Sequence, residues 1–256
     1  MRTRLKPHIP RGIEEKTTRL IILNELAQRD VRIIDPETTF VEDTATIETG
    51  VILWPHVYIL GNSVIQKGVE VKPETVIRNS QVGEHTMVES FSFISDSWIK
   101  KNCVIGPFAH IHKRSVIEER AEIGKAEIVR SHIGSGTLIK HESYVGDAEI
   151  GRHCNIGADS DVRSRPRAGK RTVVCNYDGR RKHKTVIEDN VFVGSGTKII
   201  APRRIGAKAF IAAGSLVTQD VPRGDIYGCL VISRSGKQII KPNRVKRDQN
   251  GWTILK

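Results

Sequence analysis

The sequence predicts a mainly β fold: a left-handed parallel β-helix of hexapeptide repeats, with a short N-terminal helix and an extended basic C-terminal tail. The first observation is a spacing of aliphatic residues by six, occasionally five, which starts at Val41 and reaches Val217 with one interruption. Helices repeat about every 3.6 residues and strands about every 2, so neither element alone explains this period. Three hexads instead close one triangular coil, whose aliphatic residues point inward and stack from coil to coil.

Two features of the composition agree with this fold. The aromatic share is 5%, which suits an interior too narrow for large rings. Glycine often follows the aliphatic residue, as in Ile105-Gly106 and Ile156-Gly157, and glycine permits tight corners.

The composition also excludes several classes of protein. No stretch approaches the roughly 18 uninterrupted apolar residues of a membrane-spanning helix. The first fifteen residues have a basic start but no apolar core behind it, so we expect no secretory signal and a cytoplasmic location. The cysteines are far apart and are expected to be buried, reduced thiols; they are Cys103, Cys154, Cys175 and Cys229.

Three regions follow one another along the chain. Residues 1–38 form the helical arm, in which the apolar Ile13, Leu20, Leu23 and Ala27 share one helical face, and Asp35-Pro36 reads as a turn before the first coil. Residues 39–222 form the β-helix. A basic insertion at 159–171 is expected as a loop growing from one corner. Residues 223–256 form the tail.

The net charge of +12 is concentrated. Nine basic residues and one acid lie between Arg163 and Lys184, and a second basic run lies between Arg234 and Arg247. Such clusters attract polyanions: nucleic acid, an acidic membrane or a phosphate-rich small ligand. Nucleic acid is the least expected of these, since the sequence holds no helix-turn-helix, zinc finger or aromatic recognition motif.

A set of local motifs resembles one family. The motifs are Gly106-Pro107-Phe108-Ala109, HESYVGDAEIG over 141–151, Cys175-Asn176-Tyr177-Asp178-Gly179, Ile211-Ala212-Ala213-Gly214 and Ile232-Ser233-Arg234. Together they resemble the acetyltransferase half of the bacterial bifunctional glucosamine-1-phosphate N-acetyltransferase and N-acetylglucosamine-1-phosphate uridylyltransferase. The likeness covers about residues 18–254, and the uridylyltransferase domain has no counterpart. The resemblance implies acetyl transfer from acetyl-CoA to an amino sugar.

This chemistry has clear requirements. The ammonium of the acceptor must lose a proton before it attacks the thioester, and histidine is the usual base near neutral pH. The developing oxyanion needs backbone N–H or amide donors. The phosphates of CoA and of the sugar need lysine or arginine.

The resemblance assigns the reacting groups. His141 matches the base, and Glu127 matches the carboxylate that orients it. Their separation of fourteen residues is near a coil length, so we expect the two side chains side by side. Ala158 matches the residue whose backbone N–H faces the oxyanion, and Asn176 matches the amide at the reacting centre.

The resemblance also assigns binding residues and an assembly. Tyr144, Asn155 and Lys182 match positions that bind the sugar phosphate. Acetyl-CoA would contact Ser195, Ala213, Arg234 and Tyr177. The family site lies between subunits of a trimer, so the resemblance implies a homotrimer here.

Two phosphate-binding cations of the family are changed. His112 stands where the family has an arginine, and Val129 stands where it has a lysine. Arg130 follows directly, and one residue is missing near Lys125, so Arg130 or the arginines of the insertion are candidates to replace them. Glucosamine 1-phosphate is the first candidate acceptor. A nucleotide-linked amino sugar is the second, and a non-catalytic, polyanion-binding trimer is the alternative outside the enzymes.

A metal is not expected for acetyl transfer. His110 and His112 straddle the inward Ile111 and suggest zinc, which needs three protein ligands in a suitable geometry. The third histidine that hexapeptide-fold carbonic anhydrases supply is not evident at a matching spacing.

Overall fold

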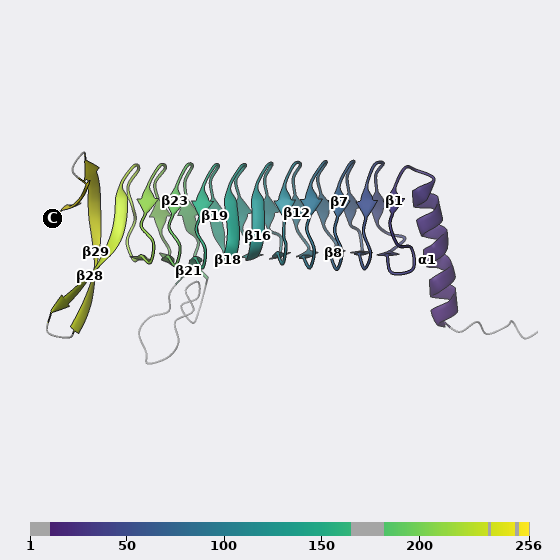
Figure 1. Ribbon diagram of the computed structural model, residues 1–256, viewed down its shortest axis with the longest axis horizontal. Coiled ribbons are helices and arrows are strands. Elements are labelled where there is room, and N and C mark those ends of the chain that lie inside the picture. The colour runs from purple at the N-terminus through teal and green to yellow at the C-terminus, as the bar shows by residue number, and fades with distance from the viewer. Residues whose placement is uncertain (1–10, 165–181, 235–236, 249–250, 256) are drawn as a thin grey trace, which may run out of the picture.

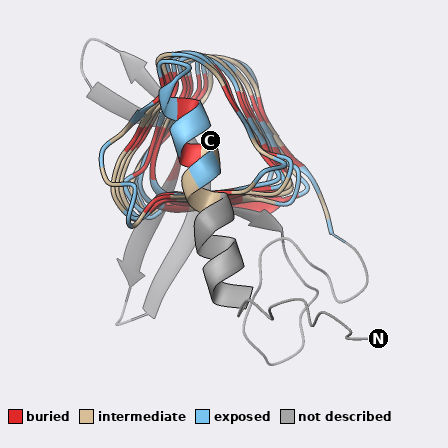
Figure 2. Ribbon diagram, turned by 90° about the vertical axis from the view of Figure 1, so that its right-hand side faces the viewer, coloured by how far each residue is buried: buried red, intermediate tan, exposed pale blue. Residues whose placement is uncertain are grey.

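The computed structural model describes residues 11–164, 182–234, 237–248 and 251–255. The molecule is a straight stack of coils, with α1 (Arg11–Ala27) across one end and β28 (Ile226–Arg234) and β29 (Lys237–Asp248) at the other (Figure 1). The cross-section is triangular, and the buried residues line its inner side (Figure 2). The parallel β-helix predicted from the six-residue period is therefore confirmed.

Helix α1 closes the first coil. Leu23 and Leu26 are buried, whereas Ala27 is exposed. The prediction that Ala27 lies on the buried face of the helix is therefore wrong, and Leu26 occupies that face instead. Residues three apart lie on one side of a helix, which lets both leucines cover the apolar end of the stack. None of the described helices is long and apolar enough to cross a membrane.

Three ladders of short parallel strands form the faces of the stack. The first face holds β1 (Arg32–Ile33), β4 (Ile52–Leu53), β7 (Glu70–Val71), β10 (Met87–Val88), β13 (Val104–Ile105), the start of β16 (Glu122–Val129) and of β18 (Leu138–Gly146), β20 (Asn155–Ile156), β23 (Phe192–Val193), β26 (Phe210–Ile211) and the start of β28.

The other two faces follow the same order along the stack. The second face holds β2 (Phe40–Val41), β5 (Tyr58–Leu60), β8 (Val76–Arg78), β11 (Phe93–Ser95), β14 (His110–His112), the ends of β16 and β18, β21 (Asp161–Ser164), β24 (Lys198–Ala201) and β27 (Leu216–Val217). The third face holds β3 (Thr46–Ile47), β6 (Val64–Ile65), β9 (Gln81–Val82), β12 (Trp98–Ile99), β15 (Val116–Ile117), β17 (His132–Ile133), β19 (Ala148–Ile150), β22 (Thr185–Ile187) and β25 (Arg204–Ile205).

The aliphatic residues of the repeat form the core. On the first face Ile105, Ile123, Ile139 and Ile156 follow one another in register, and each is at most 2% exposed. β-Branched side chains suit such strands, because they pack closely on a pleated surface. Cys103 and Cys154 are free and buried, as expected, and burial raises the pKa of the Cys103 thiol to about 11.

Three boundaries differ from the expected ones. Strand β1 already pairs with β4, so the β-helix begins at Arg32 rather than at residue 39. Strand β21 pairs with β18 and β24, so Asp161–Ser164 belongs to a regular coil, while 165–171 of the expected insertion lies outside the described residues. The backbone of the tail also folds back: β28 pairs antiparallel with β29, and β29 with β30 (Gly251–Leu255).

Candidate active site

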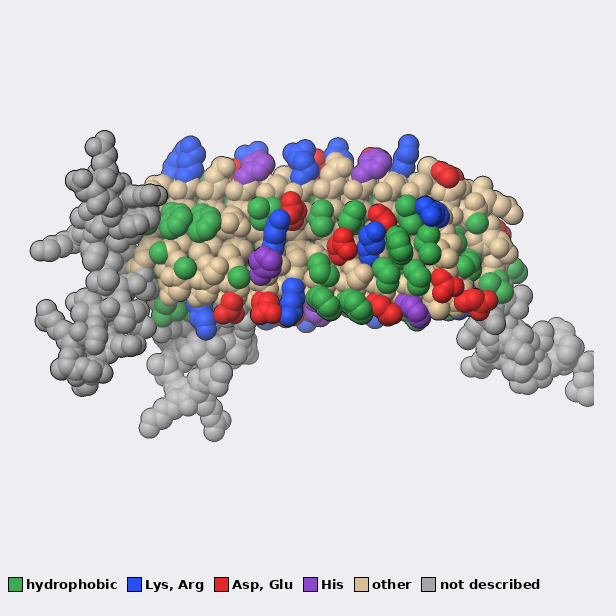
Figure 3. Space-filling model, in the orientation of Figure 1, with side chains coloured by type: hydrophobic (Ala, Val, Ile, Leu, Met, Phe, Trp, Pro, Cys, Tyr) green, Lys and Arg blue, Asp and Glu red, His purple; other side chains and the backbone are tan. Residues whose placement is uncertain are grey.

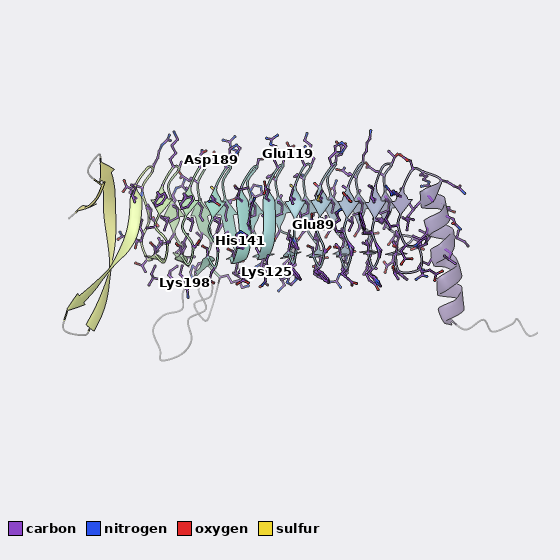
Figure 4. All side chains as sticks on the ribbon, in the orientation of Figure 1. Glu89, Glu119, Lys125, His141, Asp189 and Lys198 are labelled. Carbon is purple, nitrogen blue, oxygen red and sulfur yellow. The ribbon has the colours of Figure 1, made fainter. Side chains whose placement is uncertain are left out.

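Two long strands, β16 and β18, place the expected site residues. In most coils a corner separates the first face from the second, but β16 runs through this corner without a break. The register pairs Lys125 with His141 and Glu127 with Tyr144, and it shifts between Lys125 and Ala126. Lys125 and His141 therefore lie on adjacent coils, as Figure 4 shows. The step from Ile123 to Ile128 is one residue shorter than the step from Ile139 to Val145, and the register shifts at Glu142, the extra residue of β18.

The register corrects the expected neighbour of Glu127. Its partner on the next coil is Tyr144, seventeen residues on, whereas His141 is three residues earlier on the same strand. The Glu127 carboxylate bonds to His112 instead, with 3.0 Å between Glu127 Oε1 and His112 Nε2. The fourteen-residue spacing therefore places Glu127 and His141 diagonally, one on each of two adjacent coils, and not directly side by side.

Four expected residues form one line along the stack, which we call the His141 corner: His141, Ala158, Ser195 and Ala213. Backbone hydrogen bonds join its successive coils. The Asp159 N–H donates to the His141 carbonyl at 3.1 Å, the Gly196 N–H to the Ala158 carbonyl at 2.7 Å, and the Gly214 N–H to the Ser195 carbonyl at 2.7 Å. Within the described residues the Ala158 N–H has no acceptor, so it is available to a ligand beside His141.

Small residues keep the coils of this corner close together. A Cβ atom on Gly157 would lie 2.5 Å from the Ser195 backbone nitrogen, and one on Gly194 would lie 2.4 Å from the Ala213 nitrogen. Both glycines are thus required by close backbone approach. The consequence is a continuous, exposed corner on which His141, Ser195 and Ala213 all face solvent.

A pocket of about 490 Å³ adjoins His141. Gly106, Pro107 and Phe108 border one side, the backbone around Gly124 lies along β16, and Lys140 and His141 border the other side. The pocket occupies the place where the unbroken β16 lacks a protruding corner. Phe108 stacks on Phe91, with ring centroids 5.2 Å apart, and both rings are more than half exposed.

The charges around this pocket are paired with each other. Lys125 Nζ lies 2.6 Å from Glu142 Oε1, and this hydrogen bond holds the pKa of Glu142 below its ordinary value. Lys140 forms an ion pair with Glu122. Both pairs are largely solvent-exposed, so water screens them and a charged ligand can exchange with either partner at low cost.

Arg130 and Asp147 lie on adjacent coils at the corner between the second face and the third. We call this pair the Arg130 corner. The guanidinium binds the carboxylate in a bidentate manner, with Nε–Oδ1 at 2.6 Å and Nη2–Oδ2 at 2.8 Å. This hydrogen bonding raises the pKa of Arg130. Lys182 Nζ lies 3.9 Å from Asp147 Oδ2. Two of the expected phosphate-binding cations, Arg130 and Lys182, are therefore brought to one carboxylate.

The remaining expected residues are placed as follows. Tyr144 is partly buried, and its ring covers Gly146, where a Cβ atom would collide with it. Asn155 is exposed on the first face, in register with Leu138 and Phe192. The backbone of Arg234 ends β28. Asn176 and Tyr177 lie outside the described residues.

Sequence reasoning missed the parts that Lys125, Lys140 and Asp147 play. The signal for Lys125 was the missing residue beside it, which removes a corner and opens the pocket. Asp147 lies within the HESYVGDAEIG motif, yet no spacing rule shows that its carboxylate meets Arg130 one coil earlier.

Comparison with known proteins finds one matching repeat family and several relatives of similar sequence. Residues 184–219 match the model of the hexapeptide repeat of succinyl-transferase. The bifunctional protein GlmU of Shouchella clausii is 40% identical over 235 residues, which are 91% of this chain and 48% of that protein. The GlmU of Heliobacterium modesticaldum is 39% identical over 222 residues, 86% of this chain and 44% of that protein. The chain thus spans about half the length of the curated relatives that it matches.

A solved structure of LpxA from Acinetobacter baumannii shares the fold. It superposes with a TM-score of 0.50 at 16% identity, over 83% of this chain and 72% of that one. The chain is therefore a hexapeptide-repeat β-helix protein, homologous to one half of the bifunctional GlmU proteins.

Proposed function

We propose that the chain is an acetyl-CoA-dependent N-acetyltransferase that acts on a phosphorylated amino sugar, with glucosamine 1-phosphate as the first candidate. The observation that carries the proposal is the His141 corner. The expected base, the expected oxyanion donor and two expected acetyl-CoA contacts, which are spread over 73 residues of sequence, lie on successive coils of one exposed corner. Homology to half of the GlmU proteins supports the same activity.

In the proposed reaction His141 takes a proton from the acceptor's ammonium group. The freed amine attacks the thioester carbon, and the carbonyl π electrons move to oxygen. The Ala158 N–H lies on the coil next to His141 and is available to that oxyanion. We assign the second donor to the Asn176 amide by resemblance. The attack forms the C–N bond and leaves an extra proton on the nitrogen. Collapse of the intermediate restores the C=O double bond and breaks the C–S bond. The nitrogen gives up its extra proton, the departing CoA thiolate takes up one proton, and protonated His141 releases the other to solvent.

The orientation of His141 by Glu127 stays a prediction. It requires the Glu127 carboxylate to leave His112, to which it is hydrogen-bonded. A Glu127→Gln variant with unchanged kcat would remove Glu127 from the list of positioning residues.

The acceptor's phosphate is assigned to the neighbourhood of Lys182 and Arg130. Both cations share Asp147, and Lys182 at 3.9 Å is the more loosely held. A phosphate dianion offers more acceptor oxygens than the carboxylate does, so it is a competitive partner for these side chains.

A homotrimer with sites between subunits completes the proposal. His141 and the pocket beside it are open to solvent in one chain, and the neighbouring Val104 and Phe108 are exposed apolar side chains. Hydrophobic side chains gather in several groups on the face drawn in Figure 3. A second subunit over this region would cover the apolar surface and exclude water from the reacting groups. The proposed location is the cytoplasm.

Release of free CoA from acetyl-CoA tests the proposal, with a thiol-reactive dye as the readout and glucosamine 1-phosphate as the acceptor. Turnover that requires the acceptor and yields N-acetylglucosamine 1-phosphate would support it. Absence of CoA release with every amine of a panel of sugar phosphates and nucleotide-linked amino sugars would contradict it.

One observation favours the second candidate, a nucleotide-linked amino sugar. The position at which the family has an arginine is occupied by His112, which is bound to Glu127. A phosphate at the place it occupies in the family would therefore meet a weaker positive charge, and an acceptor with its phosphates farther from the amine would not. Turnover with such amines but not with glucosamine 1-phosphate would establish this candidate.

A further inference from the structure

We propose that His110, His112 and Glu127 form a binding site for one divalent transition-metal ion of the zinc class. The inference goes beyond acetyl transfer, and metal binding can be measured without acetyl-CoA. While an ion is bound, Glu127 is one of its ligands and does not orient His141. The inference also differs from the expectation that no metal binds here. That expectation rested on the lack of a third histidine, whereas the structure supplies a carboxylate from the next coil as the third ligand.

The backbone brings the three side chains together. In β14, Ile111 points into the core and is fully buried, so His110 and His112 both point outward on the second face. Glu127 of β16 is in register with His110 on the adjacent coil. Three outward donors from two neighbouring strands therefore lie at adjacent positions of one face.

The donor atoms are close enough for one ion. Each residue offers a donor atom, and all three donors lie within 4.8 Å of one another. In a tetrahedral zinc site with bonds of about 2.0–2.1 Å, the donor atoms are about 3.3 Å apart. His112 Nε2 and Glu127 Oε1, at 3.0 Å, already have nearly that separation. A rotation of the His110 side chain would have to bring its nitrogen from within 4.8 Å to about the same separation.

Ring contacts hold His110 beside His112. Its ring stacks on that of His112, with centroids 4.1 Å apart and planes 11° apart, and its other contact is edge-on to Phe93 at 5.3 Å. Because an imidazole nitrogen binds a metal in the plane of its ring, His110 turns out of this stack when it joins His112 and Glu127 at one ion.

A similar pair on the third face provides a control. His132 Nε2 lies 3.0 Å from Glu118 Oε1, the same separation as in the His112–Glu127 pair. No second histidine joins it in any three-donor cluster of the described residues. The difference between the two pairs is therefore His110, which turns an ordinary ion pair into a set of three ligands.

Two histidines and one carboxylate leave a fourth position open, and this donor set suits zinc. His112 is 14% exposed and Glu127 is 42% exposed, so the site is shielded beneath and open above. If the proposed function holds, on which this step alone rests, the open position lies where the family's lost arginine would have contacted the acceptor. A bound dication would restore positive charge at this place, and an oxygen of the amino-sugar acceptor could coordinate it.

The test uses the full chain, freed of metal with a chelator and titrated with cobalt(II) and then with zinc. We expect one equivalent of cobalt to give the visible absorption of a tetrahedral centre, and zinc to abolish it. Glu127→Gln and His110→Gln should each lower the affinity for zinc by more than about 100-fold, since even residues that only support a metal ligand cost 10–100-fold. His132→Gln should leave the affinity unchanged. Circular dichroism of each variant checks that the β-helix is intact.

Two outcomes overturn the site: no saturable cobalt spectrum, or a spectrum that both variants retain. Neither readout involves acetyl-CoA. Metal binding without CoA release would therefore contradict only the proposed acetyl transfer, and CoA release without metal binding would contradict only the metal site.

Discussion

The His141 corner and the Arg130 corner differ in what their side chains add to the backbone. Backbone hydrogen bonds join adjacent coils at both corners; at the Arg130 corner the Asp147 N–H donates to the Val129 carbonyl at 3.0 Å. At the His141 corner the side chains of His141, Ser195 and Ala213 project into solvent. At the Arg130 corner a side-chain pair also joins adjacent coils, and Asp147 is only 15% exposed.

The difference separates side chains that are free to react from side chains that stabilise the stack of coils. Where the backbone alone holds the geometry, a side chain can change its protonation state or exchange ligands without loosening the stack. Where two side chains hold each other, the loss of one leaves a partly buried charge without a partner, and stability falls. We therefore expect changes of the projecting side chains at the His141 corner to act on activity, and changes of the paired side chains at the Arg130 corner to act on the free energy of unfolding.

The largest effect is expected at His141. His141→Asn removes the proposed base and should lower kcat/KM about 10²- to 10⁴-fold, with no change in the melting temperature, because this exposed side chain supports no packing. His153→Asn is the control, since His153 is an exposed histidine at another corner. CoA release measures both. Wild-type turnover by His141→Asn would mean that this corner does not hold the base.

Gly157→Ala should disturb the same corner through its backbone. The new Cβ would lie 2.5 Å from the Ser195 nitrogen, and such overpacking costs about 1–3 kcal/mol. Because Ser195 must shift, the KM for acetyl-CoA should rise. Gly214→Ala is the matched control: no atom lies within 4 Å of its Cβ, and only its φ of +70° opposes the change, at about 1 kcal/mol. Equal effects of the two changes on the KM for acetyl-CoA would contradict the role of the close backbone contact at Gly157 in positioning Ser195.

Asp147→Asn should destabilise the Arg130 corner. It removes the bidentate partner of a partly buried guanidinium, so we expect a loss of about 1–2 kcal/mol in urea unfolding at neutral pH. In Asp189→Asn the partner, Arg152, is mostly exposed, so the loss should stay below about 1 kcal/mol. If Asp189→Asn lowers the free energy of unfolding more than Asp147→Asn does, the Arg130 corner does not stabilise the fold in the way proposed.

The smallest effect is expected for Glu142→Gln, next to the His141 corner in sequence. The hydrogen bond from Lys125 lowers the pKa of Glu142 in the folded chain. The resulting stabilisation is present above the ordinary glutamate pKa and is lost as the pH falls through the lowered one. Both side chains are more than half exposed, so Glu142→Gln should cost less than Asp147→Asn at pH 7. Unfolding curves at neutral and acidic pH measure both quantities, and a larger loss for Glu142→Gln would reverse the comparison.

The two corners also differ in how far the sequence predicts them. The aliphatic period fixes which residues point inward, and its unbroken stretch from Ile187 to Val217 places Ser195 and Ala213 one coil apart. Ala158 lies before the interruption of the period, and only the structure shows that it neighbours Ser195. The partners of Arg130 and Glu127 could not be predicted in this way, since they depend on side-chain conformations and on the length of each coil. Arg130 shows this: the missing residue near Lys125 makes it a candidate for the phosphate site, and that role stays a prediction, but no spacing rule predicts its bond to Asp147.

A crystal structure of the full chain with CoA would show whether the His141 corner is a functional site. We expect the CoA thiol beside His141 and the Ala158 N–H, with the pantetheine arm running along Ser195 and Ala213. CoA seated on another face of the β-helix, or no binding of CoA in solution by calorimetry, would contradict it.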